Sequence, residues 1–307
     1  MRPSDDFLNE FYDLADFDKT KRVEAINRLL TKIKLDPSVN EYCVERLITG
    51  LSSTRGASRL GYATALCALL MESKNFYTVD RLLAIAKKKL DLQDKGNEKS
   101  NAIGHHLLVS AIVRSHAYVK VDVALLNHEL EIYRLCPLLG MSVAQLIVEI
   151  VEKMDKKRFK NEVLPLIESY LNTALIQSSV AFVYLILLLR HRFSSCIAEA
   201  VSFVQKDGSC KFSQSDLTFL LLTVKKCDAS ALEPFLKLLL ETSRQSGEFA
   251  DIYRRLALMM PMIAAEMVPS FIALFYDMTL GRIVMIGFVD SSIADLFGYR
   301  PLRDCDP

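Results

Sequence analysis

Apolar residues recur three and four positions apart along most of this sequence, which is the spacing of one face of an α-helix. Between residues 19 and 33, for example, Val23, Ile26, Leu29 and Ile33 form such a stripe. We find no convincing run of alternating apolar and polar residues of the kind that predicts a strand. The pattern therefore predicts an all-α protein.

The expected helices are short and follow one another closely. Their ranges are 4–13, 19–33, 37–50, 54–72, 79–90, 99–114, 121–135, 142–154, 159–171, 179–191, 195–204, 213–226, 230–243, 249–260 and 268–277. Capping residues mark several starts, as Ser4 and Asp18 do for the first two helices. Ser142 and Ser213 each precede an acceptor one turn later, which is the pattern of a capping box.

So many short helices cannot form one simple bundle, whereas helix hairpins stacked side by side bury each other's open faces. We predict an armadillo- or HEAT-like helical-repeat superhelix over residues 1–277, although no strict sequence repeat marks it. The longest loops, 91–101 and 205–214, are the expected places for a subdivision. Residues 278–307 predict an irregular C-terminal tail, and the missing polar cap suggests a truncated or alternative product of a longer protein.

Composition limits the partners. The 38 Lys and Arg residues balance 37 Asp and Glu residues, so contact with nucleic acid or an acidic membrane would need a local patch. The seven cysteines are scattered and show no metal-binding spacing. The apolar runs at 180–189 and 256–276 are respectively too short and too interrupted by charge and proline to span a membrane, so they predict buried helices.

Catalytic motifs are missing. The stretch GLSSTRGASRLG (50–61) has neither phosphate-loop spacing nor a preceding strand. Asp16 and Asp18 stand where helix caps are expected, and no serine has a recognisable base partner. The five histidines include one adjacent pair, 105 and 106, and three that stand apart in sequence, which favours packed or surface histidines over a metal site. We expect no enzyme activity, metal, cofactor or small-molecule substrate.

The turn in ERLITGLSSTRGASRLGYATALCALL (45–70) carries the most distinctive surface chemistry. Arg55, Arg59 and Tyr62 are four and then three residues apart, so they are expected on one helix face. They are candidate partner-binding residues. The alternative is that the two arginines pair with Glu41, Glu45 or carbonyl groups at the end of the preceding helix.

A second candidate is the basic run KMDKKRFK (153–160). Lys156, Lys157 and Arg158 either line a solvated edge of the helical array or contact nucleic acid or an acidic partner.

The stretches FYDLADFDKTKRVEAINRLL (11–30) and YCVERLITGLSSTRGASRLGYATALCALL (42–70) resemble the N-terminal region of the Myb-binding protein 1A family, which includes the fungal nucleolar protein named DNA polymerase V. The shared pattern is RLITGL, a short break, an arginine, and RLGY followed by spaced Ala and Leu residues. This chain departs from the family in having Gly56 where an acidic residue is usual. The segment KKKLDLQDKGNEKSNAIGHHLLVSAIVRS (87–115) is similar to the next family block.

The resemblance implies an armadillo-type scaffold of the nucleus and nucleolus, involved in transcription of ribosomal RNA genes and in ribosome biogenesis. It implies protein partners, namely transcription factors or ribosome-assembly factors, with contact to rDNA chromatin as a further expectation. The alternatives are a general cytoplasmic adaptor of the HEAT type, suggested by the neutral charge, and a DNA polymerase, which only the family name supports.

Overall fold

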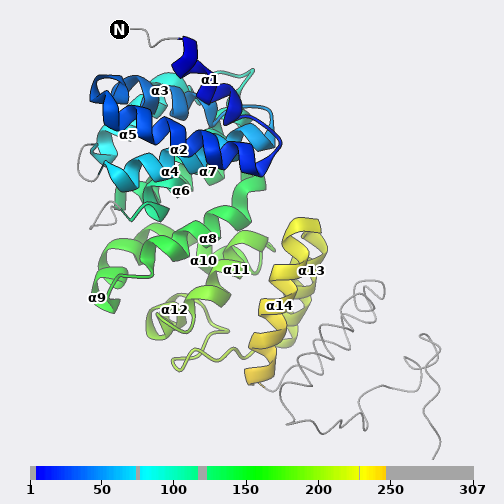
Figure 1. Ribbon diagram of the computed structural model, residues 1–307. Coiled ribbons are helices and arrows are strands. Elements are labelled where there is room, and N and C mark those ends of the chain that lie inside the picture. The colour runs from blue at the N-terminus through cyan, green and yellow to red at the C-terminus, as the bar shows by residue number, and fades with distance from the viewer. Residues whose placement is uncertain (1–4, 74–76, 117–122, 228, 247–307) are drawn as a thin grey trace, which may run out of the picture.

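The computed structural model describes residues 5–73, 77–116, 123–227 and 229–246 (Figure 1). The α-helices are α1 (Asp5–Asp13), α2 (Lys19–Leu35), α3 (Asn40–Gly50), α4 (Gly56–Glu72), α5 (Val79–Lys89), α6 (Glu98–Arg114), α7 (Val123–Leu135), α8 (Gly140–Val151), α9 (Lys156–Arg158), α10 (Leu164–Ala174), α11 (Val180–Leu189), α12 (Ser194–Ala200), α13 (Gln214–Lys226) and α14 (Ala229–Ser246). Two 3₁₀ turns, Pro37–Val39 and Pro137–Leu139, and a π-helical segment, Phe159–Val163, complete them. The all-α prediction is confirmed. The helices expected at 249–260 and 268–277 and the C-terminal tail lie outside the described residues.

Successive helices pack as neighbouring pairs along the chain. In Figure 1, α1 to α7 form the upper part of the molecule, α8 to α12 follow below them, and α13 and α14 stand beside α11. The helices on either side of the 91–101 loop both pack on α3, and those on either side of the 205–214 loop both pack on α11. A subdivision at these loops stays a prediction.

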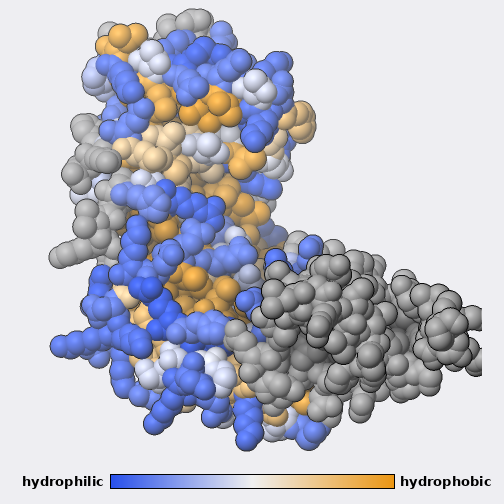
Figure 2. All heavy atoms as spheres, turned by 60° about the horizontal axis from the view of Figure 1, so that its bottom comes forward, coloured by the Kyte–Doolittle hydropathy of each residue, from blue (hydrophilic) through white to orange (hydrophobic). Residues whose placement is uncertain are grey.

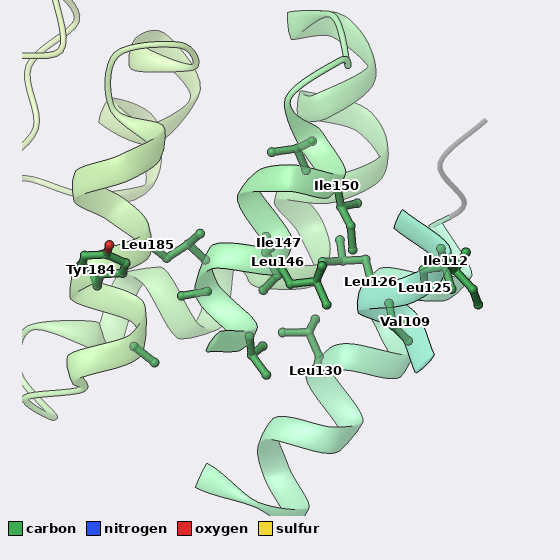
Figure 3. Packing of buried hydrophobic residues seen from close by; sticks show 14 of the residues in the cluster. Val109, Ile112, Leu125, Leu126, Leu130, Leu146, Ile147, Ile150, Tyr184 and Leu185 are labelled. Atoms are coloured by element: carbon green, nitrogen blue, oxygen red, sulfur yellow. The ribbon is translucent and has the colours of Figure 1, made fainter. Parts of the chain in front are cut away.

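The core runs without a break from one helix pair to the next. Figure 3 shows apolar side chains of α6, α7, α8 and α11 meeting in this core, with Leu126, Ile147 and Leu185 among them. Helix α11 packs against α8, α10, α12, α13 and α14, which explains why its sequence is apolar all round. The prediction that residues 180–189 form a helix buried on several sides is confirmed.

The surface of the described part is mixed. Figure 2 shows hydrophobic residues interspersed with hydrophilic ones on the face that it presents. Nine large apolar side chains of the described residues are exposed: Tyr12, Phe17, Val23, Leu35, Leu60, Met71, Leu138, Ile176 and Leu222. Among the described residues, every helix is too short or too polar to cross a membrane.

Several helix starts follow the predicted capping chemistry. Asp18 accepts a hydrogen bond from the Thr20 amide (2.8 Å) at the start of α2. Ser213 and Asp216 form a reciprocal capping box at the start of α13. These short-range bonds satisfy amide groups that have no partner inside a helix.

Other boundaries were predicted wrongly. Helix α8 begins at Gly140, after the 3₁₀ turn that starts at Pro137, so Ser142 is inside the helix and does not cap it. The helix expected at 195–204 ends at Ala200, because residues 203–211 fold back on themselves. The Lys211 amide donates to the Phe203 carbonyl (2.8 Å) there.

The helix expected at 159–171 is interrupted by the π-helical segment 159–163. Pro165, near the start of α10, has no amide to donate to the carbonyl one turn earlier. The π-helical turn therefore lies just before a position where one backbone hydrogen bond of the helix cannot form.

Candidate partner-binding surface

The turn between α3 and α4 is built around glycine and arginine. Helix α4 begins at Gly56 with Arg55 as its N-cap residue, rather than near Thr54. Gly50 ends α3 as predicted, in a helical conformation. A Cβ atom at Gly50 would lie 2.5 Å from the Tyr62 ring, so glycine is needed there because the aromatic ring packs against the α3 backbone.

Two of the three candidate residues on this turn contact the corner between α1 and α2. The Arg55 guanidinium donates to the Ala15 carbonyl (3.1 Å) and lies 4.7 Å from the centre of the Phe17 ring. The Tyr62 hydroxyl donates to the Phe11 carbonyl (3.1 Å). These contacts join segments about forty to fifty residues apart in sequence.

Arg59 turns back toward the end of α3. Its guanidinium donates to the Ser53 carbonyl (2.8 Å) and the Thr54 carbonyl (3.3 Å). The alternative expected carbonyl groups at the end of the preceding helix, whereas Ser53 and Thr54 lie in the turn that follows α3. The expected common helix face is only partly formed, because Arg55 precedes the helix. A partner-binding role for Arg55, Arg59 and Tyr62 stays a prediction.

A surface hollow of about 300 Å³ opens beside these residues. Its lining residues are Ala15, Arg46, Thr49, Gly50, Ser52, Ser53, Arg55, Ser58 and Tyr62. Burial of the Tyr62 ring raises the pKa of its hydroxyl, so this group stays a neutral donor at physiological pH. The hollow is therefore lined by hydroxyl and guanidinium groups with no carboxylate among them.

The second candidate group lies in another part of the molecule, at α9 (Figure 1). Lys156 and Lys157 are exposed, and no interaction of either side chain is found among the described residues. Arg158 pairs with Glu162 (2.8 Å), one turn along the chain. The structure therefore leaves the two lysines available, while the arginine is already paired, and a partner contact at this run stays a prediction.

Sequence reasoning missed a buried polar cluster between α6 and α7. His105 Nδ1 lies 3.0 Å from His128 Nε2, and its other ring nitrogen lies 2.9 Å from the Leu90 carbonyl oxygen. Burial lowers the pKa of His105 and lowers that of His128 to about 4. Both rings are therefore neutral at physiological pH. His128, which stands apart in sequence, has a histidine partner because the two helices pack side by side.

The neighbouring His106 connects three helices. Its Nδ1 lies 2.8 Å from a Glu129 carboxylate oxygen on α7, and its Nε2 lies 2.7 Å from the Ser142 hydroxyl on α8. Burial raises the pKa of the Glu129 carboxyl. No motif in the sequence marks this chain of hydrogen bonds.

Ser142, His106 and Glu129 follow one another in the order of a catalytic triad, in which a base activates a nucleophile and a third group orients the base. The hollow beside Arg55 does not include Ser142. A second hollow of about 210 Å³ is lined by Gly140 and Met141 but not by Ser142. Within the described residues no group of three or more His, Cys, Asp or Glu side chains is placed to hold a metal ion. The chain of hydrogen bonds joins α6, α7 and α8 to one another.

Comparison with known proteins gives consistent matches. Residues 42–230 match the family described as DNA polymerase phi. The chain is 28% identical to rat (Rattus norvegicus) Myb-binding protein 1A over 270 residues, which are 83% of this chain and 19% of that protein. It is 31% identical to the mouse (Mus musculus) protein of the same name over 199 residues, 62% of this chain and 15% of that one.

A zebrafish (Danio rerio) Myb-binding protein 1A-like protein is 38% identical over 72 residues, 23% of this chain and 6% of that one. The chain thus spans about a fifth or less of the length of these curated relatives. No solved structure matches it.

Proposed function

The chain belongs to the DNA polymerase phi family, and on that premise we propose that it is a non-enzymatic helical scaffold that binds proteins in the nucleus. More specifically, we propose that the chain acts in the nucleolus, where it takes part in transcription of ribosomal RNA genes and in ribosome biogenesis. Its partners are transcription factors or ribosome-assembly factors, with contact to rDNA chromatin through a local basic patch such as Lys156 and Lys157.

The observation that carries this proposal is the similarity to Myb-binding protein 1A over most of the chain. The name of that relative states that it binds another protein. Stacked helix pairs suit such a role, because an array of this kind presents an extended surface for a partner. Exposed apolar residues among charged ones, such as Phe17 beside Arg55, are typical of protein contact surfaces.

Imaging and co-purification of the tagged full chain test the proposal together. We expect the chain to concentrate in nucleoli and to co-purify with transcription or ribosome-assembly proteins. The pair Lys156→Glu and Lys157→Glu should lower DNA-dependent recovery if these lysines contact chromatin. The matched control is Lys95→Glu and Lys99→Glu, which makes the same charge change at exposed residues near the start of α6. A diffuse cytoplasmic chain with cytoplasmic partners would favour the general adaptor instead.

Primer extension tests whether the chain has the polymerase activity that the family description names. Asp16 accepts a hydrogen bond from the Asp18 amide (2.8 Å), and Asp18 caps α2. These contacts are those of a helix start. We expect no extension by the purified chain, and activity that is lost in Asp16→Ala with Asp18→Ala would overturn the proposal.

The Ser142–His106–Glu129 order calls for a test of hydrolase chemistry as well. A fluorophosphonate probe labels serines that a neighbouring base activates. We expect no more labelling of the wild-type chain than of Ser142→Ala. Labelling that depends on both Ser142 and His106 would show a nucleophile and would contradict a purely structural role.

A further inference from the structure

We propose that the hollow at the start of α4 binds one phosphate group carried by a serine or threonine of a partner protein. The inference deepens the proposed function, on which it rests for the presence of a partner. The hollow has the residue types that bind phosphate, because guanidinium, hydroxyl and free amide groups all donate hydrogen bonds to its oxygen atoms.

Two arginines line the hollow and have donors to spare. The Arg46 side chain is exposed, and no hydrogen bond or ion pair joins it to any described residue. The neighbouring Glu45 pairs with Lys89 instead (2.8 Å). Within the described part of the chain, the Arg55 side chain makes one hydrogen bond, which it donates to the Ala15 carbonyl. Its other N–H groups remain able to donate to a ligand.

Ser58 supplies the second, independent observation. Its residue is only 3% exposed, yet it lines the hollow. Its hydroxyl makes no hydrogen bond to any described residue. The hydroxyl is not one of the fully buried polar atoms that lack a partner, so it keeps contact with solvent at the hollow, and a ligand oxygen placed there would accept a hydrogen bond from it. The other hydroxyls here are used within the turn: Thr49 and Ser52 donate to carbonyl groups, and Ser53 accepts from the Arg55 amide.

The start of α4 lacks the negative charge that helix starts favour. Arg55 occupies the N-cap position without a side-chain capping bond, and the first turn carries no acidic residue. The positive end of the helix dipole therefore lies beside Arg55 and Arg59, which is an unfavourable arrangement. A bound anion would accept from the uncapped amides of the first turn and offset this charge.

The size of the hollow and its surroundings favour a phosphorylated peptide over a nucleic acid. A hollow of about 300 Å³ has room for one phosphate group together with part of the side chain that carries it, whereas a nucleic acid backbone needs a track of cations along its length. Asp13 and Asp16 in the adjoining α1–α2 corner are paired with Arg28 and Lys21, so their charge is offset beside the hollow. Exposed Tyr12 and Phe17 in the same corner provide apolar contact for residues flanking a phosphorylated side chain.

Fluorescence anisotropy with the purified full chain tests the site. The probe is a labelled alanine-rich peptide with one central phosphoserine, compared with its serine counterpart and with a short oligothymidine. We expect saturable binding of the phosphopeptide alone, weakened about tenfold by Arg46→Ala and by Ser58→Ala, since each removes a charge-assisted hydrogen bond. Arg81→Ala is the matched control, because Arg81 is exposed and pairs with Glu41 away from the hollow.

A second measurement locates the binding. Nuclear magnetic resonance of the labelled chain should show the Gly56, Ala57 and Ser58 amide signals shifting with the phosphopeptide. Equal binding of the serine peptide, preference for oligothymidine, or undiminished binding in both variants would each overturn the inference. These assays use purified protein, so their failure is separate from failure of the nuclear scaffold, which the imaging of tagged chain reports.

Discussion

Replacing Gly61 with alanine tests how closely α4 approaches the α1–α2 corner. A Cβ atom at residue 61 would lie 1.9 Å from the Leu14 carbonyl oxygen, and real Cβ atoms keep at least 3.0 Å. The corner must therefore retreat by more than about 1 Å, which strains packing at a typical cost of about 1–3 kcal/mol. Leu14 is fully buried, so the movement also disturbs core contacts.

The retreat would weaken the hydrogen bonds that Tyr62 and Arg55 donate to this corner, each with a net value of about 1 kcal/mol. Alanine gains about 1 kcal/mol over glycine in helix propensity. With both hydrogen bonds lost, the balance is an expected loss of about 2–4 kcal/mol in the free energy of unfolding. Urea unfolding followed by circular dichroism measures it, and hydrogen exchange should rise in residues 7–14.

Gly56→Ala is the matched control in the same helix. A Cβ atom there would meet only the end of the Arg59 side chain, at 4.0 Å. We expect this variant to be unchanged or more stable by up to about 1 kcal/mol. If Gly61→Ala were as stable as Gly56→Ala, with unchanged exchange in residues 7–14, the close approach of α4 to the corner would be refuted.

Three further predictions concern the core and the surface. Burial lowers the pKa of His128 from 6.5 to about 4, so the unfolded chain binds a proton at this histidine more tightly than the folded chain does. The free energy of unfolding therefore falls as the pH drops from 6.5 toward 4, by about 2 kcal/mol at pH 5. Urea midpoints at about pH 7 and pH 5 should therefore differ more in the wild type than in His128→Gln, and equal differences would contradict the assignment. Phe193 is fully buried and stacks on Phe159 with ring centres 3.9 Å apart. We expect Phe193→Ala to lower the free energy of unfolding by about 3–5 kcal/mol in a urea titration, and a loss below about 1 kcal/mol would contradict this packing. Arg114 donates two hydrogen bonds to the Glu149 carboxylate at the surface. Arg114→Ala should therefore lower the free energy of unfolding by less than about 1 kcal/mol in the same titration, and a larger loss would show that the pair is more than an exposed salt bridge.

The sequence predicted those parts of the fold that depend on neighbours within one helical turn. The expected α2 stripe is buried at Ile26, Leu29 and Ile33 but not at Val23, which is exposed. This stripe, the Asp18 cap and the Ser213–Asp216 capping box all involve residues two to four positions apart. The start of α8 was missed because a 3₁₀ turn after Pro137 runs directly into the helix, so a serine that resembles a cap falls inside it.

The candidate surface was predictable only in its residue types. Arg55 and Tyr62 could be chosen from the sequence as unusual residues near a turn, but the groups that they contact are the carbonyl groups of Ala15 and Phe11, 40 and 51 residues away. Backbone carbonyl groups carry no signal in the sequence. The pairing of His105 with His128 depends likewise on how α6 and α7 pack.

Crosslinking mass spectrometry of the tagged full chain in cells tests the central claim, a protein-binding scaffold of the nucleus, most directly. A lysine-reactive reagent identifies partners and contact lysines in one measurement. We predict crosslinks from exposed lysines such as Lys156 and Lys157 to transcription or ribosome-assembly proteins of the nucleolus. Crosslinks confined to cytoplasmic proteins would contradict the account.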